Sequence, residues 1–214
     1  MYPIFLNIKG KKCVIIGGGK VGERKAKRLI REKANVLVIS ESFVPYFYKR
    51  KNLVSLVKKR YSYGDIPEDS FLVFECTGDK EVAHTVFKEC KEKGSIFSSA
   101  TLPEISDFFV PSSLRYGGME IAISTYGKSS SVSRALREKI KSLLPKNLYM
   151  KIRIIEKMRK ELKSKGKKTR KENNFLLKIS RIMYEKADLS YLDFRNLVFR
   201  EAKNFQINLK RQRY

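Results

Sequence analysis

An α/β fold is predicted for this 214-residue chain, with a parallel sheet first, a small β-containing segment after it and an all-helical C-terminal domain. Three observations lead to this prediction. Short apolar runs alternate with helical patterns through the first 115 residues, which is typical of parallel strands with crossover helices. A glycine-rich turn follows the first apolar run, and from residue 146 the patterns are helical only.

The first part of the chain is predicted to alternate strands and helices. Apolar runs predict strands at residues 12–16, 35–39, 53–57, 71–76 and 95–99. Apolar side chains at helical spacing predict helices at residues 21–32, 45–51 and 81–93. Gly94 is expected to end the last of these helices, because glycine readily adopts the left-handed conformation that closes many helices.

The rest of the chain is predicted to contain two short strands and then helices. The strands are expected at residues 108–110 and 119–124, joined through a turn at Gly117 and Gly118. Helical spacing predicts helices at residues 131–144, 148–162, 172–186 and 190–203. These helices are too short to bury their apolar faces alone, so they must pack on the first domain or on a second copy of the chain. A twofold dimer is the commonest closed solution.

The glycine-rich turn has the form GxGxxG, with its glycines at Gly17, Gly19 and Gly22. In a Rossmann-type fold the first glycine permits a tight exit from the strand, and the second lets the backbone approach a pyrophosphate. The third lets the following helix pack closely on the strand. A structural turn that binds nothing can have the same residues. The apolar strand before the turn and the amphipathic helix after it favour a dinucleotide site.

The cofactor preference depends on the residues after the second strand. An Asp or Glu usually ends that strand and accepts the ribose 2′-OH, and here the position holds Ser40, with Glu41 next. Glu41 can reach the ribose from one step further on, and Ser42 adds a hydroxyl, so NAD is predicted in preference to NADP. No arginine is expected here to bind a 2′-phosphate, although Lys20 in the glycine turn could do so.

A second group of candidate residues follows the fourth strand, where Thr77 and Gly78 leave the sheet beside the expected cofactor edge. They are predicted to contact the nicotinamide or its ribose, and an ordinary capped strand exit is the alternative. The complete set of predicted cofactor-binding residues is Gly17, Gly19, Lys20, Val21, Gly22, Glu41, Ser42, Thr77 and Gly78.

The chain is strongly basic, with 47 Lys and Arg residues against 22 Asp and Glu residues and a net charge of +25. Such a charge attracts polyanions, nucleic acids included. The densest basic run, residues 163–171, comes without a zinc-finger spacing, an RNP-type aromatic motif or an evident recognition helix. A solvated basic loop is therefore favoured over a specific anion site, and a nucleic-acid partner is not expected.

The sequence also bears on location and metal binding. No apolar run approaches the ~18 residues of a membrane span, and the N-terminus lacks the order of a secretion signal. A soluble, cytoplasmic protein without a membrane partner is therefore expected. Cys13, Cys76 and Cys90 form no CxxC pair and are expected as thiols in a reducing compartment. His84 is the only histidine, and no metal site is expected.

Several blocks, in order, resemble the precorrin-2 dehydrogenase family, which also forms the N-terminal module of siroheme synthases. The blocks are residues 3–5, 17–26, 77–79, 103–111, 121–129 and 134–139. The resemblance implies NAD-dependent oxidation of precorrin-2 to sirohydrochlorin in siroheme and porphyrin biosynthesis. It also implies a homodimer whose C-terminal helices help to form the interface. Some members of the family insert iron or cobalt into the product.

The substrate that the resemblance implies is a polycarboxylate. Lys128 and Ser129 stand before the predicted helix at residues 131–144, whose N-terminus attracts anions, and they are the predicted substrate-binding residues. Simple capping of that helix by Ser129 is the alternative.

The predicted organisation has three parts. Residues 1–114 form an NAD-binding Rossmann domain, residues 115–145 a strand–loop–helix segment for dimerisation and substrate binding, and residues 146–214 a basic helical domain.

The sequence departs from the family at Thr101, where members usually carry the aspartate that is the proposed general base and chelatase residue. A threonine hydroxyl cannot act as a carboxylate base near neutral pH, and it is a poor ligand for iron. The catalytic residue therefore stays unassigned, with Glu104, Asp107 and Asp79 as possible substitutes. Iron or cobalt insertion is doubtful for the same reason.

Two other classes of function remain open. One is a non-catalytic NAD- or tetrapyrrole-binding protein that kept the fold after losing the aspartate. The other is a basic scaffold that binds RNA or another polyanion through residues 163–171.

Overall fold

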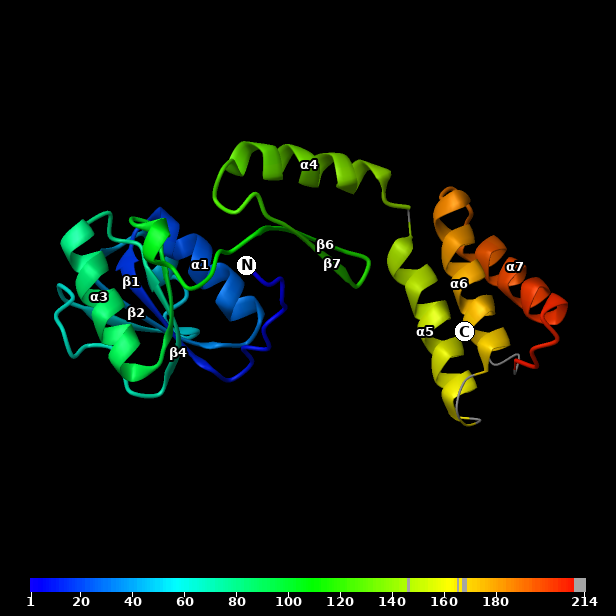
Figure 1. Cartoon of the computed structure of the whole chain (residues 1–214), viewed down its shortest axis with the longest axis horizontal. Coiled ribbons are helices and arrows are strands. Elements are labelled where there is room, and N and C mark those ends of the chain that lie inside the picture. Colours follow the sequence, from blue (N-terminus) through cyan, green and yellow to red (C-terminus); the bar gives the residue numbers. More distant parts are fainter. Residues whose placement is uncertain (146, 165, 167–168, 210–214) are drawn as a thin grey trace. The chain divides into compact units, whose positions relative to one another are not determined.

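The computed structural model describes residues 1–145, 147–164, 166 and 169–209. The chain divides into two compact units, Met1–Val110 and Pro111–Tyr214 (Figure 1). Within the described residues, no helix is long and apolar enough to span a membrane. The predicted three-part division stays a prediction.

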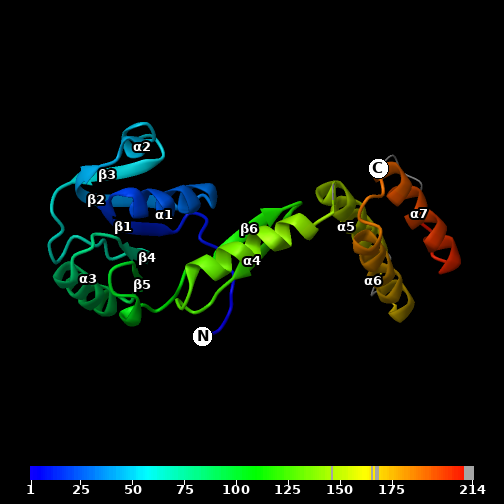
Figure 2. The ribbon, with the colours of Figure 1, turned by 90° about the horizontal axis from the view of Figure 1, so that it is seen from above.

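The first unit is built on a five-stranded parallel sheet with the strand order β3-β2-β1-β4-β5. The strands are β1 (Lys12–Gly18), β2 (Asn35–Phe43), β3 (Val54–Lys58), β4 (Ser70–Glu75) and β5 (Ile96–Ser99). The connecting helices are α1 (Lys20–Arg31), α2 (Pro45–Tyr48), α3 (Lys80–Lys93) and the 3₁₀ helix η1 (Pro103–Ile105). Figure 2 shows the strands in this order. The predicted Rossmann-type α/β fold is confirmed.

Both faces of the sheet are covered, as the apolar runs in the sequence require. Alternate residues of β1 point to opposite faces. Cys13 and Ile15 pack in one core with residues of α1, whereas Val14 and Ile16 pack in a second core with residues of α3. The glycine turn thus leaves the middle strand of a sheet that is fixed from both sides.

Two elements of this unit differ most from their predicted length. Strand β2 runs on to Phe43 instead of ending at Ile39, so Glu41 lies within the strand. Helix α2 covers only Pro45–Tyr48. Helix α3 begins and ends as its sequence predicts: Asp79 Oδ1 accepts hydrogen bonds from two backbone N–H groups of the first turn, and Gly94 closes the helix at φ +68°.

The second unit opens with a two-stranded antiparallel hairpin, β6 (Ser112–Tyr116) and β7 (Met119–Ile123). The prediction of a strand at 108–110 is therefore wrong. Gly117 and Gly118 both have positive φ and form a two-residue turn that pairs Tyr116 with Met119. The turn thus fixes the first strand at the residues just before it, and the aromatic Phe108 instead packs on the sheet core of the first unit.

Four helices complete the second unit: α4 (Ser130–Leu143), α5 (Leu148–Ser164), α6 (Arg170–Glu185) and α7 (Tyr191–Asn204). The last three share a core in which Met158, Phe175, Ile179 and Phe194 have no exposed surface. These helices begin and end close to their predicted bounds. The basic run at 163–171 lies partly outside the described residues, which omit 165, 167 and 168.

Candidate functional site

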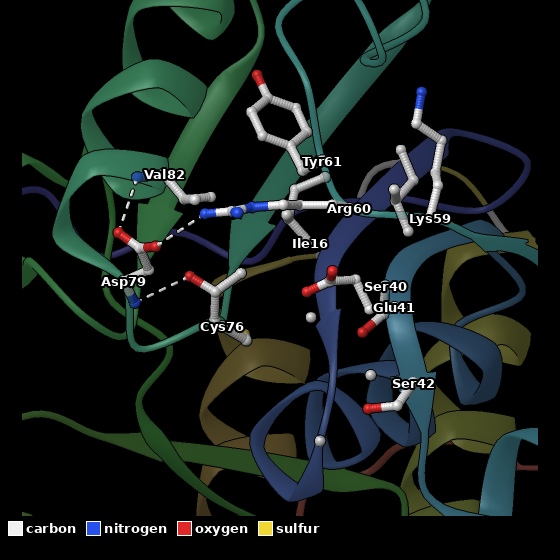
Figure 3. A pocket seen from close by; sticks show the side chains of 15 residues that line it. Ile16, Ser40, Glu41, Ser42, Lys59, Arg60, Tyr61, Cys76, Asp79 and Val82 are labelled. Carbon is white, nitrogen blue, oxygen red and sulfur yellow. Dashed lines mark hydrogen bonds and ion pairs between the residues drawn. The ribbon is translucent and has the colours of Figure 1, made fainter.

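A cavity of about 350 Å³ opens at the carboxyl edge of the sheet. It lies where the strand order reverses between β1 and β4, which is where open α/β sheets bind ligands. Its lining comes from the ends of β1 and β2, from the segments after β3 and β4 and from the start of α3 (Figure 3). The lining residues are Ile16, Gly17, Gly18, Gly19, Ile39, Ser40, Glu41, Ser42, Lys59, Arg60, Tyr61, Cys76, Thr77, Asp79 and Val82.

The three motif glycines have separate geometric reasons to be glycine. Gly17 has φ +111°, and a Cβ there would stand 2.6 Å from the carbonyl oxygen of Cys76. A Cβ on Gly22 would stand 2.1 Å from the carbonyl oxygen of Gly17, so this glycine lets α1 pack against the turn. A Cβ on Gly19 would meet nothing within 4 Å, so its missing side chain leaves open space at the cavity.

This open space suits the pyrophosphate of a dinucleotide. Gly19 is the residue before α1, and no side chain caps the helix there. The first backbone N–H groups of a helix have no partner within it, and with the helix dipole they attract an anion. The turn therefore fits the cofactor that its sequence pattern predicts.

The structure brings some of the predicted cofactor residues to the cavity and leaves others beside it. Gly17, Gly19, Glu41, Ser42 and Thr77 line the cavity. Those that adjoin the lining along the chain without being part of it are Lys20, Val21, Gly22 and Gly78.

Basic side chains also reach the cavity, which the sequence reading missed. Lys59 and Arg60, from the segment after β3, line it together with Glu41 (Figure 3). The expectation that no arginine lies at this site is therefore wrong. Strand β3 pairs with β2, and this pairing carries the basic run that follows β3 to the same edge. Lys59 Nζ lies 2.8 Å from the Asp65 carboxylate and Arg60 lies 3.9 Å from that of Asp79.

A buried carboxylate, which the sequence reading also missed, lies next to the glycine turn. Glu75 ends β4, has no exposed surface and pairs in register with Ile16 and Ser99. Its Oε1 accepts hydrogen bonds from Thr77 N (2.6 Å), Thr77 Oγ1 (2.6 Å) and Thr101 Oγ1 (2.9 Å), and its Oε2 accepts one from Ser99 Oγ (2.5 Å). The only signal in the sequence is a single acid inside the apolar run of β4.

The Thr101 hydroxyl both donates and accepts a hydrogen bond in this network. Its Oγ1 donates to Glu75 and accepts from Gly78 N at 3.1 Å, and its own N–H donates to Ser99 Oγ at 3.0 Å. Two of the proposed substitutes for the family aspartate already make structural contacts. Asp79 caps α3, and Asp107 accepts from Phe97 N and pairs with Lys91.

Cys76 lines the same cavity but is not poised for chemistry. Burial raises the pKa of the Cys76 thiol to about 12, and the nearby Lys25 ammonium only partly offsets this effect. Burial also lowers the pKa of Lys25. The thiolate, which is the reactive form, is therefore scarce near neutral pH.

The predicted substrate residues lie in the second unit. Ser129 is the N-cap of α4, and its Oγ accepts from Val132 N at 3.3 Å. Its backbone N–H donates to Thr125 Oγ1 at 3.0 Å, which fixes the loop that carries the exposed Lys128. Capping thus accounts for the Ser129 hydroxyl, and the role of both residues in substrate binding stays a prediction.

Comparisons with known proteins place this site in a family. A model of NAD(P)-binding proteins matches residues 4–112. The siroheme synthase of Salmonella dublin is 29% identical over 163 residues, which cover 75% of this chain and 35% of that protein. Siroheme synthase 1 of Klebsiella pneumoniae is 33% identical over 147 residues, which cover 68% of this chain and 31% of that protein. The chain thus spans about a third of the length of these curated relatives.

A solved structure shows the same fold along nearly the whole chain. SirC, a precorrin-2 dehydrogenase, superposes with a TM-score of 0.75 at 19% identity, covering 94% of this chain and all of that one. The prediction of NAD as the cofactor is confirmed by the NAD(P)-binding match. The chain therefore belongs to the NAD(P)-binding family, in the group of precorrin-2 dehydrogenases and siroheme synthase N-terminal domains that its motifs predict.

Proposed function

We propose that this chain is an NAD-dependent dehydrogenase that oxidises precorrin-2 to sirohydrochlorin in siroheme biosynthesis. The observation that carries the proposal is the cavity at the carboxyl edge of the sheet, where the glycine turn and Glu41 converge. Its support comes from relatives that are named siroheme synthases and from the fold shared with a precorrin-2 dehydrogenase.

Different residues of the first unit bind different parts of the cofactor. The Gly17–Gly19 turn and the N-terminus of α1 hold the pyrophosphate, and Glu41 and Ser42 bind the adenosine ribose. Thr77 contacts the nicotinamide half. NAD supplies the hydride acceptor, and the protein places it against the substrate and keeps water away.

Lys128 and Ser129 are proposed to bind carboxylates of the substrate. Lys128 is exposed, and the first turn of α4 offers backbone N–H groups to an anion. The net charge of +25 supports this role, because a basic protein attracts a polycarboxylate over a distance.

We further propose that the chain acts as a cytoplasmic homodimer without metal insertion. Three free thiols support a reducing compartment, and exposed apolar residues of α4 support a dimer. Thr101 replaces the family's acidic ligand, and its hydroxyl is engaged by Glu75 and Gly78. A neutral hydroxyl is a weak ligand for iron or cobalt compared with a carboxylate.

An anaerobic assay tests the proposal. Purified protein, precorrin-2 and NAD should give NADH absorbance together with the spectrum of sirohydrochlorin. A well-folded protein that binds NAD and yields neither signal would refute the dehydrogenase assignment and favour a non-catalytic binding protein. Adding ferrous or cobaltous ion to the completed reaction should leave the product spectrum unchanged.

A further inference from the structure

The buried carboxylate of Glu75 is an unusual group at the end of a central strand. It follows the apolar residues Phe71, Leu72, Val73 and Phe74 of β4, and it has no exposed surface. Burying a carboxylate is costly unless hydrogen bonds replace its water. Here three hydroxyls and one backbone N–H supply that replacement.

The four groups around Glu75 all donate to it, and this pattern favours an acid over an amide. A glutamine would offer one acceptor oxygen, and its NH₂ group would need an acceptor where the structure places a donor. The hydroxyl protons of Ser99, Thr77 and Thr101 point inward at the carboxylate. The chain therefore holds a proton acceptor just beneath the surface of the cofactor edge.

Thr101 connects this acceptor to the outside. The residue Thr101 is half-buried, whereas Glu75 has no exposed surface. The Thr101 proton is directed at Glu75 Oε1, and Gly78 N–H occupies one lone pair of the hydroxyl oxygen. No second donor to this oxygen is found among the described residues, so its other lone pair can accept a proton. A threonine hydroxyl alone is no base near neutral pH, but one that can pass its own proton to a carboxylate acts as a relay.

We propose that Thr101 and Glu75 form the proton-accepting pair of the reaction, an inference that rests on the proposed dehydrogenase function. Oxidation of the substrate removes a hydride, which NAD accepts, and a proton. The proton bonds to Thr101 Oγ1 while the Thr101 proton passes to Glu75 Oε1, which becomes a neutral carboxylic acid. Reversal of this transfer returns the proton to water after the product leaves. Thr101 is then the catalytic residue and Glu75 the positioning residue behind it.

Four variants of the full chain test the pair: Glu75→Gln, Thr101→Val, Thr101→Ser and the double variant Glu75→Gln/Thr101→Asp. We expect Glu75→Gln and Thr101→Val to lower kcat by about 100-fold or more, the usual scale for losing a general base. The KM for precorrin-2 and the Kd for NAD should change by less than about threefold, since a tenfold change would mean a lost binding contact. Thr101→Ser keeps the hydroxyl and should stay within about fivefold of wild type, below the effect of losing the base.

The double variant separates proton transfer from structural support. It places a carboxylate at the surface, so it should be at least about tenfold faster than Glu75→Gln although the buried acid is still missing. Ser95→Ala is the matched control. Ser95 is buried at the opposite end of β5, where its hydroxyl donates to Ser70 O at 2.7 Å, so this variant loses a comparable hydrogen bond far from the site. Its kcat should equal that of wild type.

The outcomes separate the pair from the proposed function. Wild-type turnover combined with a Glu75→Gln or Thr101→Val kcat near wild type would overturn the pair and leave the dehydrogenase intact. The pair would also be overturned if kcat fell only as far as NAD affinity or melting temperature does. A double variant no faster than Glu75→Gln would overturn it as well. If Glu75→Gln does not fold, Thr101→Val decides, because it leaves three donors on Glu75. A wild-type protein without turnover removes both proposals.

Discussion

Gly19 and Gly22 lie three residues apart in the same motif but differ in what surrounds them. A side chain on Gly22 would collide with the backbone of Gly17, whereas one on Gly19 would enter open space. Packing requires Gly22, and we propose that the cofactor requires Gly19. This difference lets substitutions distinguish folding from cofactor binding within one motif.

Gly19→Asp should fold and lose NAD. Its φ of −80° suits any residue, but the new carboxylate would occupy the place of the pyrophosphate and repel it. Juxtaposed like charges cost several kcal/mol, so we expect the Kd for NAD to rise at least about 100-fold with an unchanged melting temperature. Gly22→Ala is the counterpart and should destabilise the fold itself. Calorimetric titration and thermal unfolding check both, and NAD affinity retained by Gly19→Asp would contradict the proposed turn.

The preference for NAD or NADP depends on the balance of acidic and basic side chains at one edge of the cavity. We propose that Glu41 favours the ribose diol of NAD and repels a 2′-phosphate, while Lys59 and Arg60 line the same cavity. The ion pairs that these two basic residues form with Asp65 and Asp79 weaken their electrostatic attraction for a second anion. Glu41 is therefore expected to decide the preference.

Glu41→Ser should weaken NAD and strengthen NADP. Losing a bidentate contact to the ribose costs roughly 1.5–3 kcal/mol, which is about 10- to 100-fold in Kd. The 2′-phosphate would then meet the two basic side chains without an opposing carboxylate from residue 41. Parallel titrations with both cofactors measure the ratio, and a ratio that stays at the wild-type value would exclude Glu41 as the selecting residue.

Among the elements, α3 holds the segment between β3 and β4 through a second buried acid. Glu89 has no exposed surface; its carboxylate accepts from Tyr61 Oη (2.5 Å) and Ile66 N (3.0 Å) and lies 2.9 Å from Lys93 Nζ. Burial alone would raise the pKa of Glu89, but these hydrogen bonds together lower it. The segment between β3 and β4, which carries Arg60 to the cavity, is thereby anchored on α3.

The lowered pKa of Glu89 gives a signed pH dependence of stability. A carboxyl group whose folded-state pKa lies below its unfolded value stabilises the fold above the unfolded value and loses this effect as pH falls through the folded value. Glu89→Gln should lower the free energy of unfolding by roughly 1–3 kcal/mol at pH 7, because an amide cannot accept all the hydrogen bonds that Tyr61, Ile66 and Lys93 donate to the buried carboxylate. The difference from wild type should shrink below about pH 4.5. Urea unfolding at several pH values measures it, and a difference that does not vary with pH would refute this account.

The elements also show what a single sequence can and cannot predict. Strands and helices of the first unit follow from local patterns, because apolar runs and caps such as Asp79 and Gly94 lie within each element. The role of Glu75 could not be predicted, since its partners come from residues up to 26 positions away and depend on the pairing of β4 with β5. The place of Arg60 likewise depends on which strand lies beside β2.

At the scale of the whole molecule, the excess positive charge has a consequence for a polycarboxylate substrate. Exposed charges act over a distance of about 8–10 Å at physiological salt, and added salt screens them. Raising NaCl from about 50 to about 300 mM should therefore raise the KM for precorrin-2 several-fold while kcat changes little.

Lys128→Glu should raise the KM for precorrin-2 by about tenfold, and Lys141→Glu, the same charge change on α4, should raise it less. Equal effects would remove Lys128 from the substrate site.

The apolar face of α4 bears on the assembly of the whole molecule. Val132, Leu136 and Leu143 share one face of the helix and expose 56%, 47% and 67% of their surface. If this face lies in a twofold dimer, one substitution on it changes the interface twice, once in each protomer. Leu136→Glu forfeits roughly 2 kcal/mol of burial per copy, about 4 kcal/mol in all, which weakens the dimer about 1000-fold. Sedimentation velocity should show wild type and Lys141→Glu, whose change lies on the opposite face of α4, as dimers and Leu136→Glu as a monomer that still binds NAD. A dimeric Leu136→Glu would exclude this face from the interface.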